Sequence, residues 1–175
     1  MNLPNQLTLL RVAMIPVCLL LWALGQPVWA AIVFALAAVT DFLDGYIART
    51  RHLVTVFGKF ADPVADKILV LTAMIFLTAD GFLPAWAVCV VAARELMVDG
   101  LRLVAVGKGN VIAAGWLGKI KTNLQFFCVL SAMLLPKGHW LTLTLAVAMA
   151  IMTIWSGAQY FWESRHVFRE SEKPE

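Results

Sequence analysis

Four aspartates between Asp41 and Asp66 constrain this chain more than any other feature. The stretch reads DFLDGYIARTRHLVTVFGKFADPVAD, and the segments on both sides of it are apolar and of helical length. One Asp at the centre of a membrane-spanning helix costs roughly 2.5 to 3.5 kcal/mol, so four unpaired aspartates would cost on the order of 10 kcal/mol. Something must therefore neutralise these carboxylates.

The composition predicts an all-α integral membrane protein. Of the 175 residues, 61% are hydrophobic and 14% are charged, whereas a soluble domain has about 25% charged residues. We expect a single membrane domain over residues 1–175, with a frayed tail from about residue 164. The net charge of +3 is spread over short links, which argues against nucleic-acid binding and fits contact with anionic lipid headgroups.

Six apolar segments have the length of a membrane-spanning helix. At 1.5 Å per residue, about 20 residues cross a hydrocarbon core of about 30 Å. The sequence therefore predicts a six-transmembrane-helix bundle, with helices over about 7–24, 28–49, 59–78, 84–106, 116–135 and 140–162.

The lysines and arginines predict the orientation. Most lie at the two ends of the chain and around the links after the second and fourth predicted helices: Arg11, Arg49, Arg51, Lys59, Arg102, Lys108, Lys119, Lys121, Arg165, Arg169 and Lys173. The opposite turns hold only Lys137. By the positive-inside rule, we expect both termini and a polar cavity at the acidic stretch to face the cytoplasm. The expected location is the inner membrane of a bacterium.

The spacing of the aspartates predicts a metal site. Asp41 and Asp44 are three residues apart and Asp62 and Asp66 are four apart, so each pair shares one face of its helix. Two divalent cations would cancel the four negative charges. Oxygen ligands without His or Cys favour Mg²⁺ or Mn²⁺ over Zn²⁺.

The residues after the first pair leave room for a phosphorylated ligand. Gly45 and Ala48 leave the backbone bare, so a bulky ligand can approach the metals closely. Arg49 is placed to meet a phosphate.

A second set of charged residues occurs later in the chain, within apolar segments. Arg94 and Glu95 lie midway along the fourth predicted helix, and Lys119 and Lys121 begin the fifth. Arg94 and Glu95 form either an internal ion pair or a pair that presents the guanidinium to an anionic substrate. The two lysines either extend to headgroups or join Arg94 in a basic pocket. Arg102 is a weaker candidate for the same pocket.

The aspartate stretch resembles the signature of the CDP-alcohol phosphatidyltransferases. Its pattern, D-x2-D-G-x2-A-R-x8-G-x3-D-x3-D, is matched at every fixed position by Asp41, Asp44, Gly45, Ala48, Arg49, Gly58, Asp62 and Asp66. Three shorter motifs resemble the bacterial branch that makes phosphatidylglycerophosphate: PNxLTxxR from Pro4 to Arg11, ARE from Ala93 to Glu95, and GKxKT from Gly118 to Thr122.

The resemblance implies an enzyme of phospholipid biosynthesis that transfers the phosphatidyl group of CDP-diacylglycerol to sn-glycerol 3-phosphate and releases CMP. It implies that Asp41, Asp44, Asp62 and Asp66 bind two metal ions and that Asp66 is also the general base. It implies a nucleotide site lined by Asp44, Gly45, Ala48, Arg49 and Gly58, with Asn5 and Thr8 nearby. The acceptor phosphate would bind Arg94, Lys119 and Lys121, with Arg102 as the weaker candidate. A homodimer is also implied.

Two alternatives follow from the same residues. The aspartate signature serves other acceptors equally, such as inositol phosphate, serine or a second phospholipid, and only the basic pocket and the branch resemblance favour glycerol 3-phosphate. A divalent-cation transporter would also need carboxylates in a membrane. Against it, the carboxylates gather at one face, and Arg94 would repel a cation at mid-depth.

Overall fold

Six α-helices make up the described part of the chain. The computed structural model describes the backbone of residues 3–50, 56–107 and 116–164, and the side chains of residues 6–40, 64–105 and 116–164. The helices are α1 (Leu3–Ala23), α2 (Pro27–Thr50), α3 (Val56–Ala79), α4 (Ala85–Gly107), α5 (Trp116–Leu134) and α6 (Trp140–Glu163). These bounds confirm six helices at the predicted places.

The first helix begins four residues before its predicted start. Pro4 lies in the first turn of α1, where a backbone N–H has no partner inside the helix and its absence costs little. The polar residues before Leu7 therefore extend the helix. The helix also continues through Pro16.

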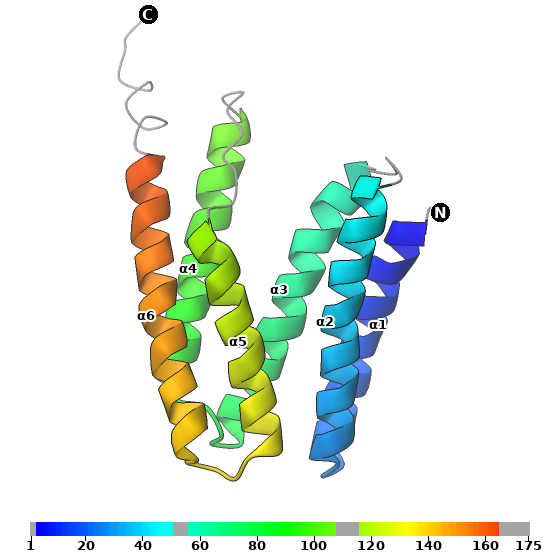
Figure 1. The fold of residues 1–175 in the computed structure, drawn as a ribbon, viewed down its shortest axis with the longest axis vertical. Coiled ribbons are helices and arrows are strands. Elements are labelled where there is room, and N and C mark those ends of the chain that lie inside the picture. Colours follow the sequence, from blue (N-terminus) through cyan, green and yellow to red (C-terminus); the bar gives the residue numbers. More distant parts are fainter. Residues whose placement is uncertain (1–2, 51–55, 108–115, 165–175) are drawn as a thin grey trace, which may run out of the picture.

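The helices run alternately up and down, so the helix ends that carry the four aspartates lie at the same end of the bundle. Figure 1 shows that α1, α3 and α5 begin, and α2, α4 and α6 end, at the upper end of the bundle. The aspartates of α2 lie near its end and those of α3 near its start. Both acidic pairs thus belong to the same end of the molecule, as the sequence predicted.

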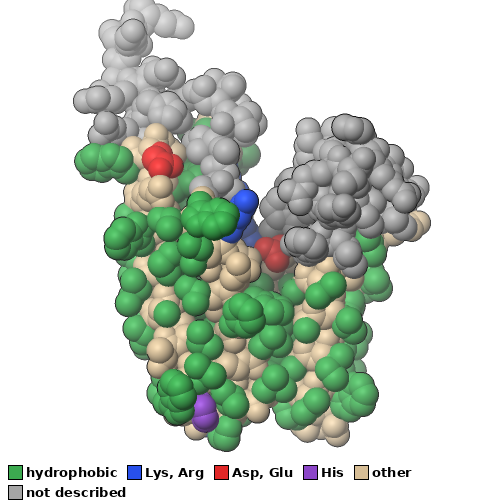
Figure 2. All heavy atoms as spheres, in the orientation of Figure 1, with side chains coloured by type: hydrophobic (Ala, Val, Ile, Leu, Met, Phe, Trp, Pro, Cys, Tyr) green, Lys and Arg blue, Asp and Glu red, His purple; other side chains and the backbone are tan. Residues whose placement is uncertain are grey.

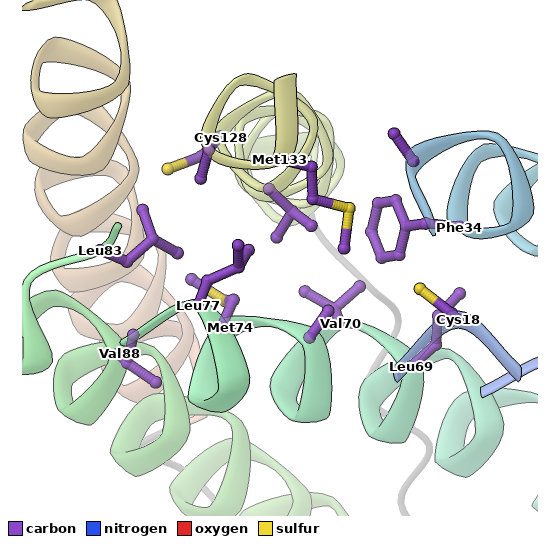
Figure 3. Packing of buried hydrophobic residues seen from close by; sticks show 14 of the residues in the cluster. Cys18, Phe34, Leu69, Val70, Met74, Leu77, Leu83, Val88, Cys128 and Met133 are labelled. Atoms are coloured by element: carbon purple, nitrogen blue, oxygen red, sulfur yellow. The ribbon is translucent and has the colours of Figure 1, made fainter. Parts of the chain in front are cut away.

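Helix α3 is the centre of the packing, since it contacts α1, α2, α4 and α5. Its residues Leu69, Val70, Met74 and Leu77 are buried and repeat at helical spacing along one side. Figure 3 shows them facing side chains from other helices, among them Met133 of α5 and Phe34 of α2. The position of Asp66, one turn before this buried stripe, is therefore set by the core.

The lower end of the bundle is tied together by one polar and aromatic cluster. Trp22 at the end of α1 donates its indole N–H to Asp80 Oδ2 at 2.6 Å, just after α3. The Trp22 ring also packs edge-on against Phe82, with centroids 5.1 Å apart. Lys137, in the turn before α6, lies over the Phe82 ring, with its Nζ 5.0 Å from the ring centroid. Three turns are thereby joined far from the acidic pairs.

We expect Trp22→Phe to lower the stability by about 1 kcal/mol, because it removes the hydrogen bond to Asp80 and keeps an aromatic ring beside Phe82. Thermal unfolding in detergent measures the change. Unaltered stability would mean that the Trp22–Asp80 contact contributes nothing to holding the turns.

Much of the outer surface is apolar. Large hydrophobic side chains are exposed on all six helices, including Leu20, Leu36, Ile75, Leu96 and Ile154. Figure 2 shows hydrophobic side chains over the lower part of one face. Such an extensive apolar surface marks contact with lipid or with another protein. By length and hydropathy, two helices of the described chain qualify as membrane spans, over Gln6–Ala23 and Trp140–Glu163.

Candidate active site

A polar cavity lies among α3, α4, α5 and α6. Its volume of about 230 Å³ is slightly below the roughly 300–1,000 Å³ of typical drug-sized ligand pockets, so it suits a small polar molecule. Figure 2 shows acidic and basic side chains meeting in a hollow toward the upper end of the bundle. The polar lining residues are Asp66, Lys67, Arg94, Glu95, Arg102, Lys119, Lys121, Thr122, Gln125, Ser156, Gln159, Tyr160 and Glu163.

Helical periodicity brings these side chains into one cavity. On α4, the lining residues Val91, Glu95, Val98 and Arg102 follow one another at intervals of three or four, which places them on one face. On α5, Lys121 and Gln125 in the same way share a face. The cavity therefore forms where the faces that carry these polar side chains meet.

Glu95 is the centre of an ion-pair cluster within the cavity. Glu95 is 5% exposed, and its carboxylate accepts a hydrogen bond from Lys121 Nζ of α5. Arg94 Nη1 donates to the same carboxylate oxygen at 3.3 Å, and Lys67 Nζ of α3 lies 3.9 Å from the other oxygen. Because a buried carboxylate is stable only when it is paired, this cluster fixes three helices relative to one another.

Lys67 and Asp99 belong to the same cluster and were missed by the sequence analysis. Lys67 Nζ donates to Asp99 of α4, one turn after Glu95. Lys67 directly follows Asp66, so the pairing with α4 also restrains the residue beside the predicted base. The sequence signals for this cluster were the spacing of Glu95 and Asp99, four residues apart on α4, and the presence of Lys67 in an apolar segment.

Two further predicted cations also line the cavity. Arg102 donates its Nε–H to the Tyr160 hydroxyl of α6 at 3.0 Å, and its guanidinium lies 5.4 Å from the centroid of that ring. Lys119 is exposed and lies over Trp116, 5.6 Å from the ring centroid. All four predicted acceptor-binding residues are thus brought together, with Lys119 at the rim.

Two buried donors in the cavity have no hydrogen-bond partner in the described part of the protein. They are Arg94 Nε and Gln125 Nε2, and both side chains line the cavity. An unpaired buried donor costs about 1–3 kcal/mol, so these groups favour a ligand that carries acceptor oxygens. Gln125 was not predicted from the sequence, where it stands as one polar residue in an apolar helix.

The structure describes the predicted metal ligands only in part. Asp66 lines the cavity and is half-buried, whereas the side chains of Asp41, Asp44 and Asp62 lie outside the described residues. The described backbone places all four on α2 and α3, helices that contact each other. A set of four carboxylates on two neighbouring helices suits hard divalent cations.

Most of the predicted nucleotide-binding residues also have side chains outside the described part of the structure. The side chains of Asn5, Arg49 and Ala48, and the environments of Gly45 and Gly58, lie outside the described residues. Thr8 is buried in α1 and is not among the described residues that line the cavity. The nucleotide site stays a prediction.

Arg11, in the same amino-terminal motif, is fully buried. Its Nε–H donates to the carbonyl oxygen of Ala37 in α2 at 3.3 Å, one helical turn before Asp41. The motif therefore ties α1 to the part of α2 that leads into the acidic stretch.

Comparisons with known proteins identify the family of this chain. The sequence profile of the CDP-alcohol phosphatidyltransferase family matches residues 1–155. The chain is 42% identical to the CDP-diacylglycerol–glycerol-3-phosphate 3-phosphatidyltransferase of Bacillus subtilis, over 93% of this chain and 96% of that protein. It is 38% identical to the proteins of that name from Sodalis glossinidius and Escherichia coli K12, over 95% and 94% of this chain and 96% and 95% of theirs. The chain belongs to the CDP-alcohol phosphatidyltransferase family.

Proposed function

We propose that this protein transfers the phosphatidyl group of CDP-diacylglycerol to sn-glycerol 3-phosphate, giving phosphatidylglycerophosphate and CMP. The observation that carries the proposal is the cavity that combines Asp66 with the cations Arg94 and Lys121. The names of the relatives, which include both substrates, support it.

The charge of the cavity favours a phosphorylated acceptor. Its described lining holds five cationic side chains, Lys67, Arg94, Arg102, Lys119 and Lys121, and three acidic ones, Asp66, Glu95 and Glu163, a balance of +2. The balance is +1 when Asp99, which pairs with Lys67, is included. A phosphate monoester carries about −1.5 to −2 at neutral pH. The unpartnered N–H groups of Arg94 and Gln125 supply donors for its oxygens. An acceptor without a phosphate, such as serine, has no net charge and would leave the positive charge of the cavity uncompensated.

In the proposed reaction, the acceptor hydroxyl oxygen bonds to the phosphorus that carries the diacylglycerol. The bond from that phosphorus to the CMP oxygen breaks, and CMP leaves with the electron pair. The carboxylate of Asp66 takes the hydroxyl proton, while Arg94 and Lys121 hold the acceptor phosphate and so orient its hydroxyl. Two Mg²⁺ or Mn²⁺ ions, held by Asp41, Asp44, Asp62 and Asp66, would neutralise the pyrophosphate and the leaving CMP.

For CDP-diacylglycerol, we propose that the cytidine nucleotide binds Asp44, Gly45, Ala48, Arg49 and Gly58, with Asn5 and Thr8 nearby. The diacyl chains would stay in the bilayer. The exposed apolar side chains on all six helices support six membrane crossings. The gathering of Lys and Arg at the end of the bundle that holds the cavity supports a cavity that faces the cytoplasm, with both termini on that side. A bacterial inner-membrane location and a homodimer complete the proposal.

The alternative acceptors, inositol phosphate, serine and a second phospholipid, would use the same aspartates. A divalent-cation transporter is less well supported, because Arg94 and Lys121 line the cavity and would repel a cation.

The proposal is tested by measuring CMP release from CDP-diacylglycerol by the purified protein in detergent with Mg²⁺. Glycerol 3-phosphate, inositol phosphate, serine and glycerol are supplied in separate reactions. We expect release with glycerol 3-phosphate and background release with the others. Equal release with glycerol would contradict the role of the cationic cavity, and no release with any acceptor would contradict the transferase.

A further inference from the structure

One buried glycine of α6, Gly157, lies beside residues that line the cavity and has no side chain of its own. Gly157 lies next to Ser156, and both are buried, while Ser156 lines the cavity. A Cβ atom built on Gly157 would lie 3.2 Å from Cγ of Arg94, a carbon in the aliphatic part of that side chain. Helix α6 can therefore approach α4 at this level because residue 157 has no side chain.

The Arg94 side chain has little freedom to move away. Its side chain is 13% exposed, and its Nη1 is held 3.3 Å from Glu95 Oε1. Glu95 is itself fixed by Lys121. The stem thus lies between the backbone of α6 on one side and the ion-pair cluster on the other.

A small displacement of Cγ becomes a larger one at the guanidinium. An added methyl group at residue 157 would force Cγ to shift by a few tenths of an ångström. The guanidinium lies several times farther than Cγ from the Cα–Cβ bond about which the side chain turns, so its shift is roughly 1 Å, enough to lower a rate by up to about 10²-fold. The unpartnered Nε–H of Arg94 would move with it.

We infer that Gly157 is a positioning residue for the acceptor: by leaving its space to the Arg94 stem, it sets where the Arg94 guanidinium meets the phosphate of glycerol 3-phosphate. This inference rests on the proposed function. It assigns to α6 a part in acceptor recognition, which the motifs on α4 and α5 do not indicate.

The test compares Gly157→Ala with the wild type in steady-state CMP release. We expect the KM for glycerol 3-phosphate to rise about tenfold and the KM for CDP-diacylglycerol to stay within about twofold, because only the acceptor contacts are displaced. Gly100→Ala is the matched control, since it adds the same methyl group to α4 at a site with nothing within 4 Å. The control should behave as the wild type does.

A double-mutant cycle with Arg94→Ala separates this mechanism from a general loosening of the bundle. Alanine has no Cγ, so Gly157→Ala should add no further increase in the KM for glycerol 3-phosphate in that background. The same tenfold increase there, a parallel increase for both substrates, or a Gly157→Ala variant with wild-type kinetics would overturn the inference. Absence of CMP release by the wild type would instead overturn the proposed function.

Discussion

We expect Asp66→Asn to lower the rate of CMP release by about 10³-fold, because general base catalysis by a positioned carboxylate contributes about 10²- to 10⁴-fold. The same carboxylate is also a proposed metal ligand. Asp66 lines the cavity on α3, and the buried stripe that follows it holds this part of the helix in place. An amide keeps the size of the side chain and removes both its charge and its basicity. The measurement is the rate of CMP release at saturating CDP-diacylglycerol and glycerol 3-phosphate.

Asp80→Asn is the matched control for this prediction. It makes the same chemical change at the opposite end of the bundle, where Asp80 is exposed and accepts a hydrogen bond from Trp22. We expect this variant to retain wild-type turnover, since an amide oxygen can still accept that bond. Equal losses in the two variants would mean that Asp66 acts through stability alone, and a fully active Asp66→Asn would remove it from the mechanism.

The second large effect is expected for Lys121→Met. Lys121 is buried and donates to Glu95, so its loss leaves a buried carboxylate with weaker partners and lowers the stability by about 3 kcal/mol. It also removes a cation from the proposed phosphate site, so we expect the KM for glycerol 3-phosphate to rise at least about tenfold. Thermal unfolding and initial rates in detergent measure the two effects separately.

Lys137→Met removes a cation from the opposite end of the bundle, where Lys137 lies over Phe82. The KM for glycerol 3-phosphate should not change in this variant. If Lys121→Met lost stability but kept its KM, Lys121 would serve only the ion-pair cluster and not the acceptor.

The helices were predictable because each apolar segment is long and is bounded by turn residues. The turns at Gly25 and Gly81 have φ angles of 71° and 75°, which glycine adopts without strain. The grouping of the aspartates at one end followed from an alternating path through six segments. The predicted start of α1 was too late, because the polar residues before Leu7 were read as preceding the helix and instead form its first turn.

The contacts within the cavity were less predictable, because a single sequence shows which residues share a face but not which helix lies opposite. The sequence left Arg94 and Glu95 either as an ion pair or as a substrate-binding pair. The structure supports features of both, since Nη1 of Arg94 contacts Glu95 and its Nε has no partner among the described residues. Lys67, Gln125 and Gly157 gain their significance only from the way α3, α4, α5 and α6 come together at the cavity.

The central claim is tested most directly by identifying the lipid product. The wild-type protein is incubated in detergent with Mg²⁺, CDP-diacylglycerol and isotopically labelled glycerol 3-phosphate, and CMP and labelled lipid are quantified by mass spectrometry. The proposed reaction predicts equimolar CMP and labelled phosphatidylglycerophosphate, with both absent in Asp66→Asn. CMP without labelled lipid would contradict the transfer to glycerol 3-phosphate, and labelled lipid that forms equally well in the Asp66→Asn variant would contradict the role of Asp66.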